Sequence, residues 1–287
     1  MSTPQRRSDP ENDRRPISLA PLTVLELGPD ELVACAAEAG YDGVGLRLVR
    51  ATEEEPLRPT IGRTPLIRET RRRLDDTGLF VLDVEVLRLR PDTRVRDDFG
   101  GVLETAAYLG ASAALVTGND ADRARLSDNL AELADFAAEF GLRPNLEPMP
   151  WTDVGDLGEA TSILRGCRSD RVGLLVDALH YDRARATPED LRALPADWIQ
   201  YIQICDGLLP RPTSMDELRF QGRNARLFPG EGCIDLTGML QALPEVPVSI
   251  EAPIQWHAPP QVRAGAALRA ARRVVTRADA TRLPLSA

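Results

Sequence analysis

The sequence is poor in histidine, cysteine and aromatic side chains, and these shortages restrict its chemistry. It has 2 histidines and 4 cysteines in 287 residues, and 5% of its residues are aromatic. The cysteines lie far apart without the paired spacing of zinc ligands, which indicates reduced thiols in a cytoplasm and no structural zinc site. They are Cys35, Cys167, Cys205 and Cys233.

Long apolar runs and an excess of basic charge are also missing. No stretch approaches the roughly 18 consecutive apolar residues of a transmembrane helix, so we expect no membrane partner. Residues 1–16 are polar and lack the apolar stretch of a signal peptide, which predicts a disordered tail and a cytoplasmic protein. A net charge of −9 and a pI near 5.0 argue against the broad basic surface of a nucleic-acid-binding protein.

The sequence does contain a regular alternation of short apolar runs with longer helical patterns, repeated eight times from residue 17. Start signals such as Thr64-Pro65 and Thr187-Pro188, and glycines after the helices, mark the boundaries. The predicted strands cover residues 17–27, 41–48, 79–87, 111–117, 142–147, 172–177, 198–205 and 246–251. The predicted helices cover residues 30–39, 65–77, 97–109, 127–141, 157–166, a segment from 188, 236–243 and 260–275.

Eight such repeats predict a parallel α/β sheet closed into a single (β/α)8 TIM barrel over residues 17–287. The length would also allow two small domains. The rival architecture is an open doubly wound sheet, but its usual G-x-G-x-x-G loop after the first strand is absent from this sequence.

Four consecutive predicted strands end in polar side chains. In a TIM barrel the chemistry lies at these carboxyl ends, which here carry Glu147, Asp177, Gln203 with Asp206, and Glu251. Three converging carboxylates repel one another unless a proton or a cation joins them. Three acids and an amide oxygen favour Mg²⁺ or Mn²⁺. The alternative is that each acid is solvated or paired with a nearby arginine.

Further candidates lie in the loops that follow these strands. His180 comes three residues after Asp177, in the predicted loop leaving the sixth strand. Arg226 precedes a tight turn at Gly230 and Gly232, where its guanidinium could bind a carboxylate, a phosphate or a hydroxyl. Weaker candidates for the walls of a pocket are Met149, Trp151, Arg47, Glu85 and Arg88. His257 is expected to be an ordinary loop residue.

At these residues the chain resembles the xylose-isomerase-like TIM-barrel superfamily, which includes ketose 3-epimerases, inosose dehydratases and 3-dehydroshikimate dehydratases. The resemblance spans nearly all of residues 17–275. It rests on Glu147, the D-x-x-H of Asp177 to His180, the YIQICD of the seventh strand, the R-x-x-P-G-E-G of Arg226 to Gly232, and Glu251. The superfamily also includes the trinuclear zinc enzyme endonuclease IV, whose site needs more histidines than this chain has.

The resemblance implies that Glu147, Asp177, Gln203 and Glu251 hold one divalent metal ion, while His180 and Arg226 face the substrate. The sequence departs from the commoner pattern because epimerases and isomerases usually have histidine where Gln203 stands. Glutamine at this position resembles the 3-dehydroshikimate dehydratases. Relatives are commonly dimers or tetramers, which implies a homo-oligomer.

The resulting hypothesis is a metal-dependent isomerase or epimerase that acts on a keto sugar or related polyol ketone. Glu147 or Glu251 would remove the α proton, and the cation would stabilise the enediolate. His180 would orient or protonate a hydroxyl, and Arg226 would bind the distal end, with Trp151, Glu85 and Arg47 as further substrate contacts. The alternatives are a dehydratase of a cyclic keto acid or inosose, and a non-catalytic sugar-binding barrel.

Overall fold

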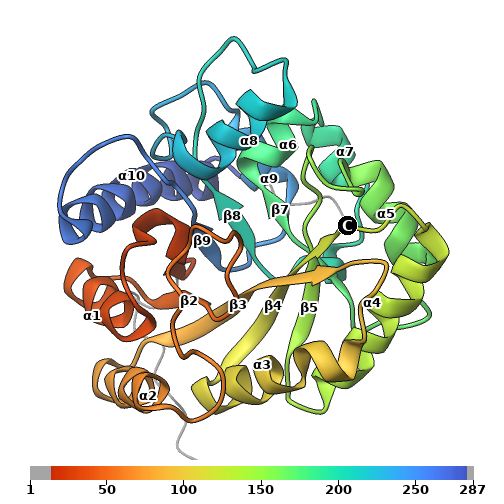
Figure 1. Cartoon of the computed structure of the whole chain (residues 1–287). Coiled ribbons are helices and arrows are strands. Elements are labelled where there is room, and N and C mark those ends of the chain that lie inside the picture. The colour runs from red at the N-terminus through yellow and green to blue at the C-terminus, as the bar shows by residue number, and fades with distance from the viewer. Residues whose placement is uncertain (1–13, 283–287) are drawn as a thin grey trace, which may run out of the picture.

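Parallel strands surrounded by helices form a closed barrel in the computed structural model, which describes residues 14–282 (Figure 1). The sheet has nine strands in the order β6-β5-β4-β3-β2-β1-β9-β8-β7. The strands are β1 (Ile17–Leu19), β2 (Gly43–Arg47), β3 (Phe80–Leu89), β4 (Ala111–Gly118), β5 (Arg143–Leu146), β6 (Gly173–Leu174), β7 (Val176–Asp177), β8 (Ile202–Ile204) and β9 (Val248–Ile250).

The barrel closes through the sixth predicted strand, which is divided in two at Leu175. Its first half, β6, pairs with β5, and its second half, β7, pairs with β8. Because both halves belong to one continuous segment, the two ends of the sheet order meet there. The predicted (β/α)8 barrel is therefore confirmed, with the eight predicted strands appearing as nine.

Helices alternate with the strands and surround them (Figure 1). They are α1 (Pro29–Ala39), α2 (Pro65–Thr77), α3 (Val95–Leu109), α4 (Arg123–Ala138), α5 (Leu157–Gly166), α6 (Ala178–Arg183), α7 (Pro188–Arg192), α8 (Met215–Asn224), α9 (Leu236–Ala242) and α10 (Pro260–Ala280), with 3-10 turns η2 (Pro21–Val24) and η3 (Ala196–Trp198). The predicted start of α2 is confirmed, because Thr64 Oγ1 accepts a hydrogen bond from the Ile67 amide at 3.3 Å.

Three predicted boundaries are wrong. The first strand stops at Leu19 because Pro21 has no N–H to donate to a neighbouring strand and opens η2 instead. The seventh predicted strand begins late, since Trp198 lies in η3 and β8 covers only Ile202–Ile204. Helix α4 is capped by the Asp122 side chain and not by Ser127.

Two helices next to the strand ends replace predicted loops. His180 lies in the first turn of α6 and not in a loop, because the Asp177 side chain caps this helix. The predicted long polar loop after the seventh strand contains α8, which begins with a capping box at Ser214 and Glu217. The S-x-x-E spacing of these two residues is the sequence signal that identifies this helix.

The core of the protein consists of two apolar clusters, and the acid Asp83 is buried beside the smaller one. One large core lies between strands and helices, and a smaller cluster comprises Leu82, Val86, Ala113, Leu115, Leu175 and Tyr201. The Tyr201 hydroxyl donates a hydrogen bond to Asp83 Oδ2 at 3.0 Å. Burial raises the pKa of the Asp83 carboxyl well above its usual value, and the nearby Glu85 charge adds to this effect. Asp83 therefore favours its neutral form.

The predicted disordered tail, residues 1–16, lies mostly outside the described residues. Its last residues contact the barrel instead of being disordered: Arg14 pairs with Asp42 at 2.6 Å, and the buried Arg15 pairs with Asp279 at 2.7 Å. None of the helices within residues 14–282 has the length and apolar character needed to cross a bilayer.

Asp206, at the end of the seventh predicted strand, organises the loop that carries Arg226. This buried carboxylate accepts hydrogen bonds from the amides of Gly207 at 2.8 Å, Gly230 at 3.0 Å and Ile234 at 3.0 Å. A Cβ at Gly232 would lie 2.4 Å from Asp206 Oδ1, so only glycine fits there. Asp206 thus stabilises the backbone of this loop by accepting hydrogen bonds from its amides, and it is not among the residues that line the central cavity.

The Asp206→Ala substitution is expected to lower the free energy of unfolding by about 3 kcal/mol, because it leaves three backbone amides without their charged acceptor. Urea unfolding followed by circular dichroism measures this change. The exposed Asp216→Ala variant is the control and should change stability by less than about 0.5 kcal/mol. Equal stability of the two variants would contradict the assigned role of Asp206.

Candidate active site

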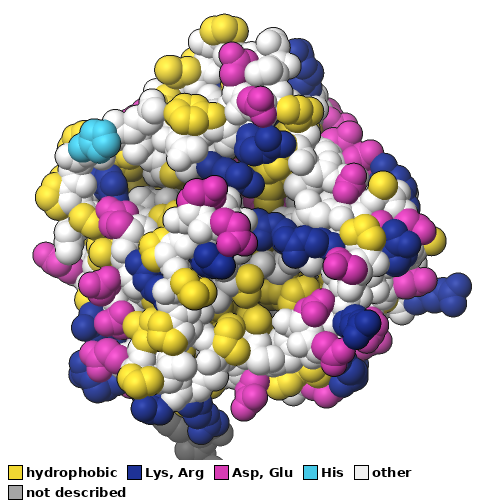
Figure 2. All heavy atoms as spheres, in the orientation of Figure 1, with side chains coloured by type: hydrophobic (Ala, Val, Ile, Leu, Met, Phe, Trp, Pro, Cys, Tyr) yellow, Lys and Arg dark blue, Asp and Glu magenta, His cyan; other side chains and the backbone are white. Residues whose placement is uncertain are grey.

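A cavity of about 680 Å³ lies where the strands end, and the space-filling view shows a hollow on this face (Figure 2). Its size is typical of small-molecule sites. Polar residues line it from β2 through to the segment after β9: Arg47, Glu85, Arg88, Thr117, Asn119, Glu147, His180 and Glu251. The predicted wall residues Met149 and Trp151 also line the cavity.

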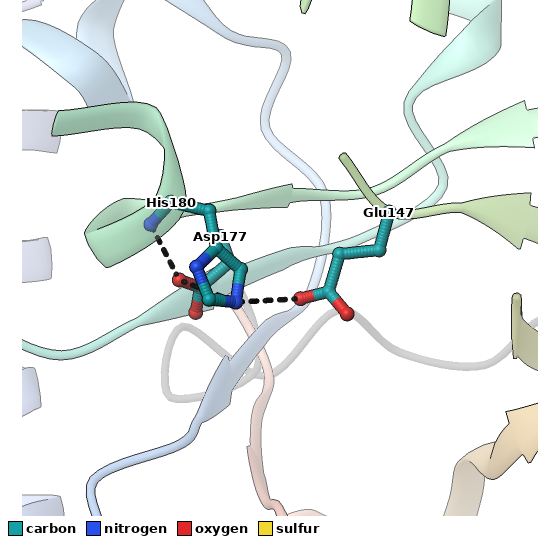
Figure 3. Close-up of side chains that lie close together, drawn as sticks. All are labelled: Glu147, Asp177 and His180. Carbon is teal, nitrogen blue, oxygen red and sulfur yellow. Dashed lines mark hydrogen bonds and ion pairs between the residues drawn. The ribbon is translucent and has the colours of Figure 1, made fainter. Parts of the chain in front are cut away.

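Glu147, Asp177 and His180 form a compact buried cluster (Figure 3), of which Glu147 and His180 line the cavity. The imidazole lies between the two carboxylates, with His180 Nε2 3.7 Å from Glu147 Oε1 and 3.8 Å from Asp177 Oδ1. One potential ligand atom from each residue lies within 4.8 Å of the others. Because Asp177 caps α6 by accepting the His180 amide at 3.0 Å, the D-x-x-H spacing itself places the two side chains together.

Gln203 lies beside this cluster, since it is the register partner of Asp177 across β7 and β8. Its side chain is fully buried, and neither Oε1 nor Nε2 has a hydrogen-bond partner among the described residues. Within the same residues, Glu147 Oε1 and His180 Nδ1 also lack one. Leaving such groups unpaired costs roughly 1–3 kcal/mol each. These atoms are therefore suited to a ligand.

Arg226, which also lines the cavity, joins two of the acids. Its guanidinium is 2% exposed and lies 2.7 Å from Asp177 Oδ2 and 2.9 Å from Glu251 Oε2. Its Nε donates to the Gly222 carbonyl in α8 at 2.7 Å. The structure thus places Arg226 in contact with the protein's own carboxylates, as in the alternative in which acids pair with an arginine.

The ionisation of the cluster follows from burial and from these pairs. Burial raises the pKa of Glu147 well above its usual value, and the charges of Glu251 and Asp177 add to it. Burial also raises the pKa of Glu251 to about 7, against the opposing effect of Arg226. For Asp177, burial is outweighed by Arg226 and His180, so its pKa is lowered.

Burial lowers the pKa of His180 to about 4, so its imidazole is neutral at physiological pH. Among the described residues, Arg226 is then the one cation paired with any of the three acids: it contacts Asp177 and Glu251, and Glu147 has no cationic partner. When all three are ionised, two negative charges remain uncompensated. One divalent cation would balance them, and the donor atoms present fit such an ion.

The predicted substrate contacts Arg47 and Glu85 line the cavity but pair with each other. Arg47 Nη2 lies 2.8 Å from Glu85 Oε1, and Arg47 Nη1 lies 2.8 Å from Glu55 Oε1. Trp151 contacts His180 edge to face, with ring centroids 4.8 Å apart. His257 is exposed and lies outside the residues that line the cavity.

Several lining residues were not identified from the sequence. Arg219, Gly222 and Arg223 reach the cavity from α8, which was predicted as loop. Gly222 lies against Trp151, because a Cβ there would be 2.4 Å from the indole ring. Thr117 and Asn119 line the cavity at the end of β4. The G-N-D sequence that ends this strand could have identified them, because it places polar residues at the carboxyl end of the strand.

Comparison with known proteins agrees with this fold and extends over most of the chain. A family model described as xylose isomerase-like TIM barrel matches residues 33–274. The 3-dehydroshikimate dehydratase of Pseudomonas aeruginosa is 32% identical over 236 residues, which covers 78% of this chain and 35% of that protein. The inosose isomerase of Bacillus subtilis is 29% identical over 159 residues, which covers 52% of this chain and 55% of that protein.

Among solved structures, IOLI protein with a bound zinc atom is similar with a TM-score of 0.71 and 22% identity, over 94% of this chain and 100% of that chain. At this identity the likeness shows the fold alone. The chain spans 35% of the length of the dehydratase that it matches. Because the family model covers residues 33–274 and the barrel is closed as that family requires, the chain belongs to the xylose isomerase-like TIM barrel family.

Proposed function

We propose that this chain is an enzyme that removes the proton next to the carbonyl of a polyol ketone, with one divalent cation at the buried acids. The observation that carries the proposal is the Glu147, Asp177 and His180 cluster, which opens onto the cavity and has unpartnered donor atoms. Proton removal next to a carbonyl can begin each of three reactions of a polyol ketone, namely dehydration, isomerisation and epimerisation.

The residues proposed to hold the cation are those predicted from the sequence: Glu147, Asp177, Gln203 and Glu251. Gln203 supports this set through its unpartnered amide oxygen, and Glu251 through its position beside Arg226. When bound, the cation would polarise the substrate carbonyl as a Lewis acid. The oxygen donors favour Mn²⁺ or Mg²⁺, while the nearby His180 nitrogen and the zinc in the related structure make Zn²⁺ a further candidate.

Glu147 is the proposed base, because Oε1 has no hydrogen-bond partner among residues 14–282 and the residue lines the cavity. It would take the α proton while the C–H electron pair moves into the carbonyl. Glu251 would then deliver a proton, and Arg226 would hold its carboxylate in place. His180, neutral and packed against Trp151, would accept or donate a hydrogen bond at a substrate hydroxyl.

The first candidate outcome is dehydration, in which the electron pair expels a β-hydroxyl that leaves as water after accepting a proton. The 32% identity to a 3-dehydroshikimate dehydratase supports this outcome. The second candidate is isomerisation or epimerisation, in which the proton returns to carbon. It is supported by the two carboxylates Glu147 and Glu251, which line one cavity as a base and an acid, and by the inosose isomerase relative.

The sequence contains no lysine, which restricts the chemistry further. Within these 287 residues there is no side-chain amine that could form an iminium with the ketone. Negative charge on the carbonyl oxygen must then be stabilised by a cation or by hydrogen bonds, which agrees with the uncompensated charge of the cluster.

Purified protein is expected to contain about one divalent ion per chain, and Glu147→Gln and Asp177→Asn should reduce it at least about tenfold by removing ligand charge. Mass spectrometry of metal content after loading with Mn²⁺, Mg²⁺ or Zn²⁺ measures this. His180→Asn should retain the metal if His180 faces the substrate, and should lose it if the imidazole is a ligand. Glu104→Gln, on an exposed face of α3, is the control. Equal and negligible metal in all variants would refute the site.

The Gln203→Leu substitution tests whether Gln203 is a metal ligand or only contributes to the stability of the fold. Because the buried amide makes no hydrogen bonds among the described residues, leucine should leave the metal-free melting temperature unchanged or raise it. Metal affinity, measured by titration calorimetry, should nevertheless fall at least about tenfold. A large loss of stability without metal, or unchanged affinity, would exclude the proposed role of Gln203.

Glu147→Gln should slow the reaction about 10²–10⁴-fold, since it removes the proposed base. The metal-loaded protein is incubated in D₂O with 3-dehydroshikimate, inososes and ketohexoses, and NMR follows deuterium uptake and products. Loss of water supports the dehydratase, and exchange with a rearranged or inverted product supports the isomerase or epimerase. Inertness of the wild type across this panel would support a sugar-binding barrel, and the Glu104→Gln variant should match the wild type.

A further inference from the structure

The arginines that line the cavity fall into two groups. Arg47 and Arg226 are neutralised by the protein's own carboxylates at 2.7–2.9 Å. Arg88 and Arg223 line the same cavity, yet neither side chain forms a hydrogen bond or ion pair with any residue from 14 to 282. The second pair is therefore available to a ligand.

Arg88 and Arg223 approach the cavity from opposite elements, the end of β3 and the last turn of α8. Both side chains are partly buried, and burial is the largest cause of a lowered pKa for each. The positive charges of Arg90, Arg47 and Arg223 lower the pKa of Arg88 further, and those of Arg219 and Arg47 lower the pKa of Arg223. Basic side chains gather around the central hollow in Figure 2.

The nearest opposing charges do not neutralise these arginines. Glu55 acts weakly on both and Glu54 on Arg223, but Glu55 already pairs with Arg47, and Glu54 is exposed at the rim. Arg219, also on α8, pairs with Asp216 at 3.2 Å. An anion between or beside two partly desolvated guanidinium groups that line one cavity would stabilise them.

Neutral hydrogen-bonding groups complete this wall. Thr117 is the register partner of Arg88 across β3 and β4, and its hydroxyl donates to Asn119 Oδ1 at 2.7 Å. That bond turns the Asn119 amide into a donor group at the cavity lining. Arginine and amide donors therefore line the same cavity as the carboxylates of Glu147 and Glu251.

We infer that Arg88 and Arg223 bind an anionic oxygen group, a carboxylate or a phosphate, at the end of the substrate remote from its reacting carbonyl. The inference rests on the proposed function and specifies its substrate class as an acidic polyol ketone instead of a neutral sugar. The guanidinium fork matches both anions, because each offers two oxygens in the right geometry. The sequence predicts this role for Arg226, but in the structure Arg226 pairs with Asp177 and Glu251.

Binding of unreactive probes tests this inference without requiring turnover. Shikimate has a ring carboxylate and no ketone, and its methyl ester is the neutral counterpart; glucitol 6-phosphate and glucitol, which have no carbonyl, form the phosphate pair. Titration calorimetry of the metal-loaded wild type should show at least about tenfold tighter binding of one anion than of its neutral counterpart. The preferred pair identifies a carboxylate or a phosphate.

Arg88→Gln and Arg223→Gln should each reduce that preference at least about fivefold, and the double variant should abolish it. Arg90→Gln is the matched control, since Arg90 is two residues from Arg88 and lies outside the cavity lining. It should keep the preference. Circular dichroism and metal content show that the variants remain folded and loaded.

The inference is overturned if the wild type prefers neither anion, or if the double variant keeps the wild-type preference. Failure of the proposed function has a different signature. A chain that binds an anion through Arg88 and Arg223 but exchanges no α proton in D₂O would retain the anion site and refute the enzyme.

Discussion

The bridge formed by the Arg226 guanidinium between Asp177 and Glu251 is the interaction on which the rest of the site depends. It joins the ends of β7 and β9, two strands separated by β8, lowers the pKa of the buried Asp177 and opposes the rise that burial causes in the pKa of Glu251. Removing one partner of such a buried pair commonly costs about 3–5 kcal/mol, because the other charge is left uncompensated. The loop held by Asp206 and the Gly222 carbonyl of α8 both serve to keep this guanidinium in place.

This bridge also sets the charge of the centre. Arg226 balances one negative charge of the three acids when all are ionised, and the buried Gln203 amide and Glu147 Oε1 have no hydrogen-bond partner among residues 14–282, which supports the proposed cation site. Away from the centre, Arg88 and Arg223 have no such partners among residues 14–282. The arginines that line the cavity therefore have two roles. Arg226 is a counter-ion for buried acids of the protein, whereas Arg88 and Arg223 have charges that a ligand could pair with.

Much of the fold could be predicted from local pattern. Thr64 at the start of α2 and the glycines after α1, α2 and α3 mark helix ends through backbone geometry that depends on a few neighbouring residues. The errors lay where local signals were weak or overlooked: Pro21 shortened the first strand, and the Ser214 capping box of α8 lay inside a polar segment read as loop. With α8 missed, Arg223 could not be assigned to the site.

The sequence by itself determined the eight repeats, the barrel, and the residues at the strand ends, because strand and helix periodicity and terminal polar residues are local properties. It also showed His180 three residues after Asp177, although in a predicted loop; the side chains meet because this segment is helix α6, in which the N-cap and the third residue are neighbours. Only the tertiary structure decided which charges meet. Arg226 lies 49 residues from Asp177 and 25 from Glu251 in the chain, and no sequence pattern shows that it pairs with both. Nor does a pattern show that Arg88 and Arg223 line one cavity without a hydrogen-bond or ion-pair partner among residues 14–282.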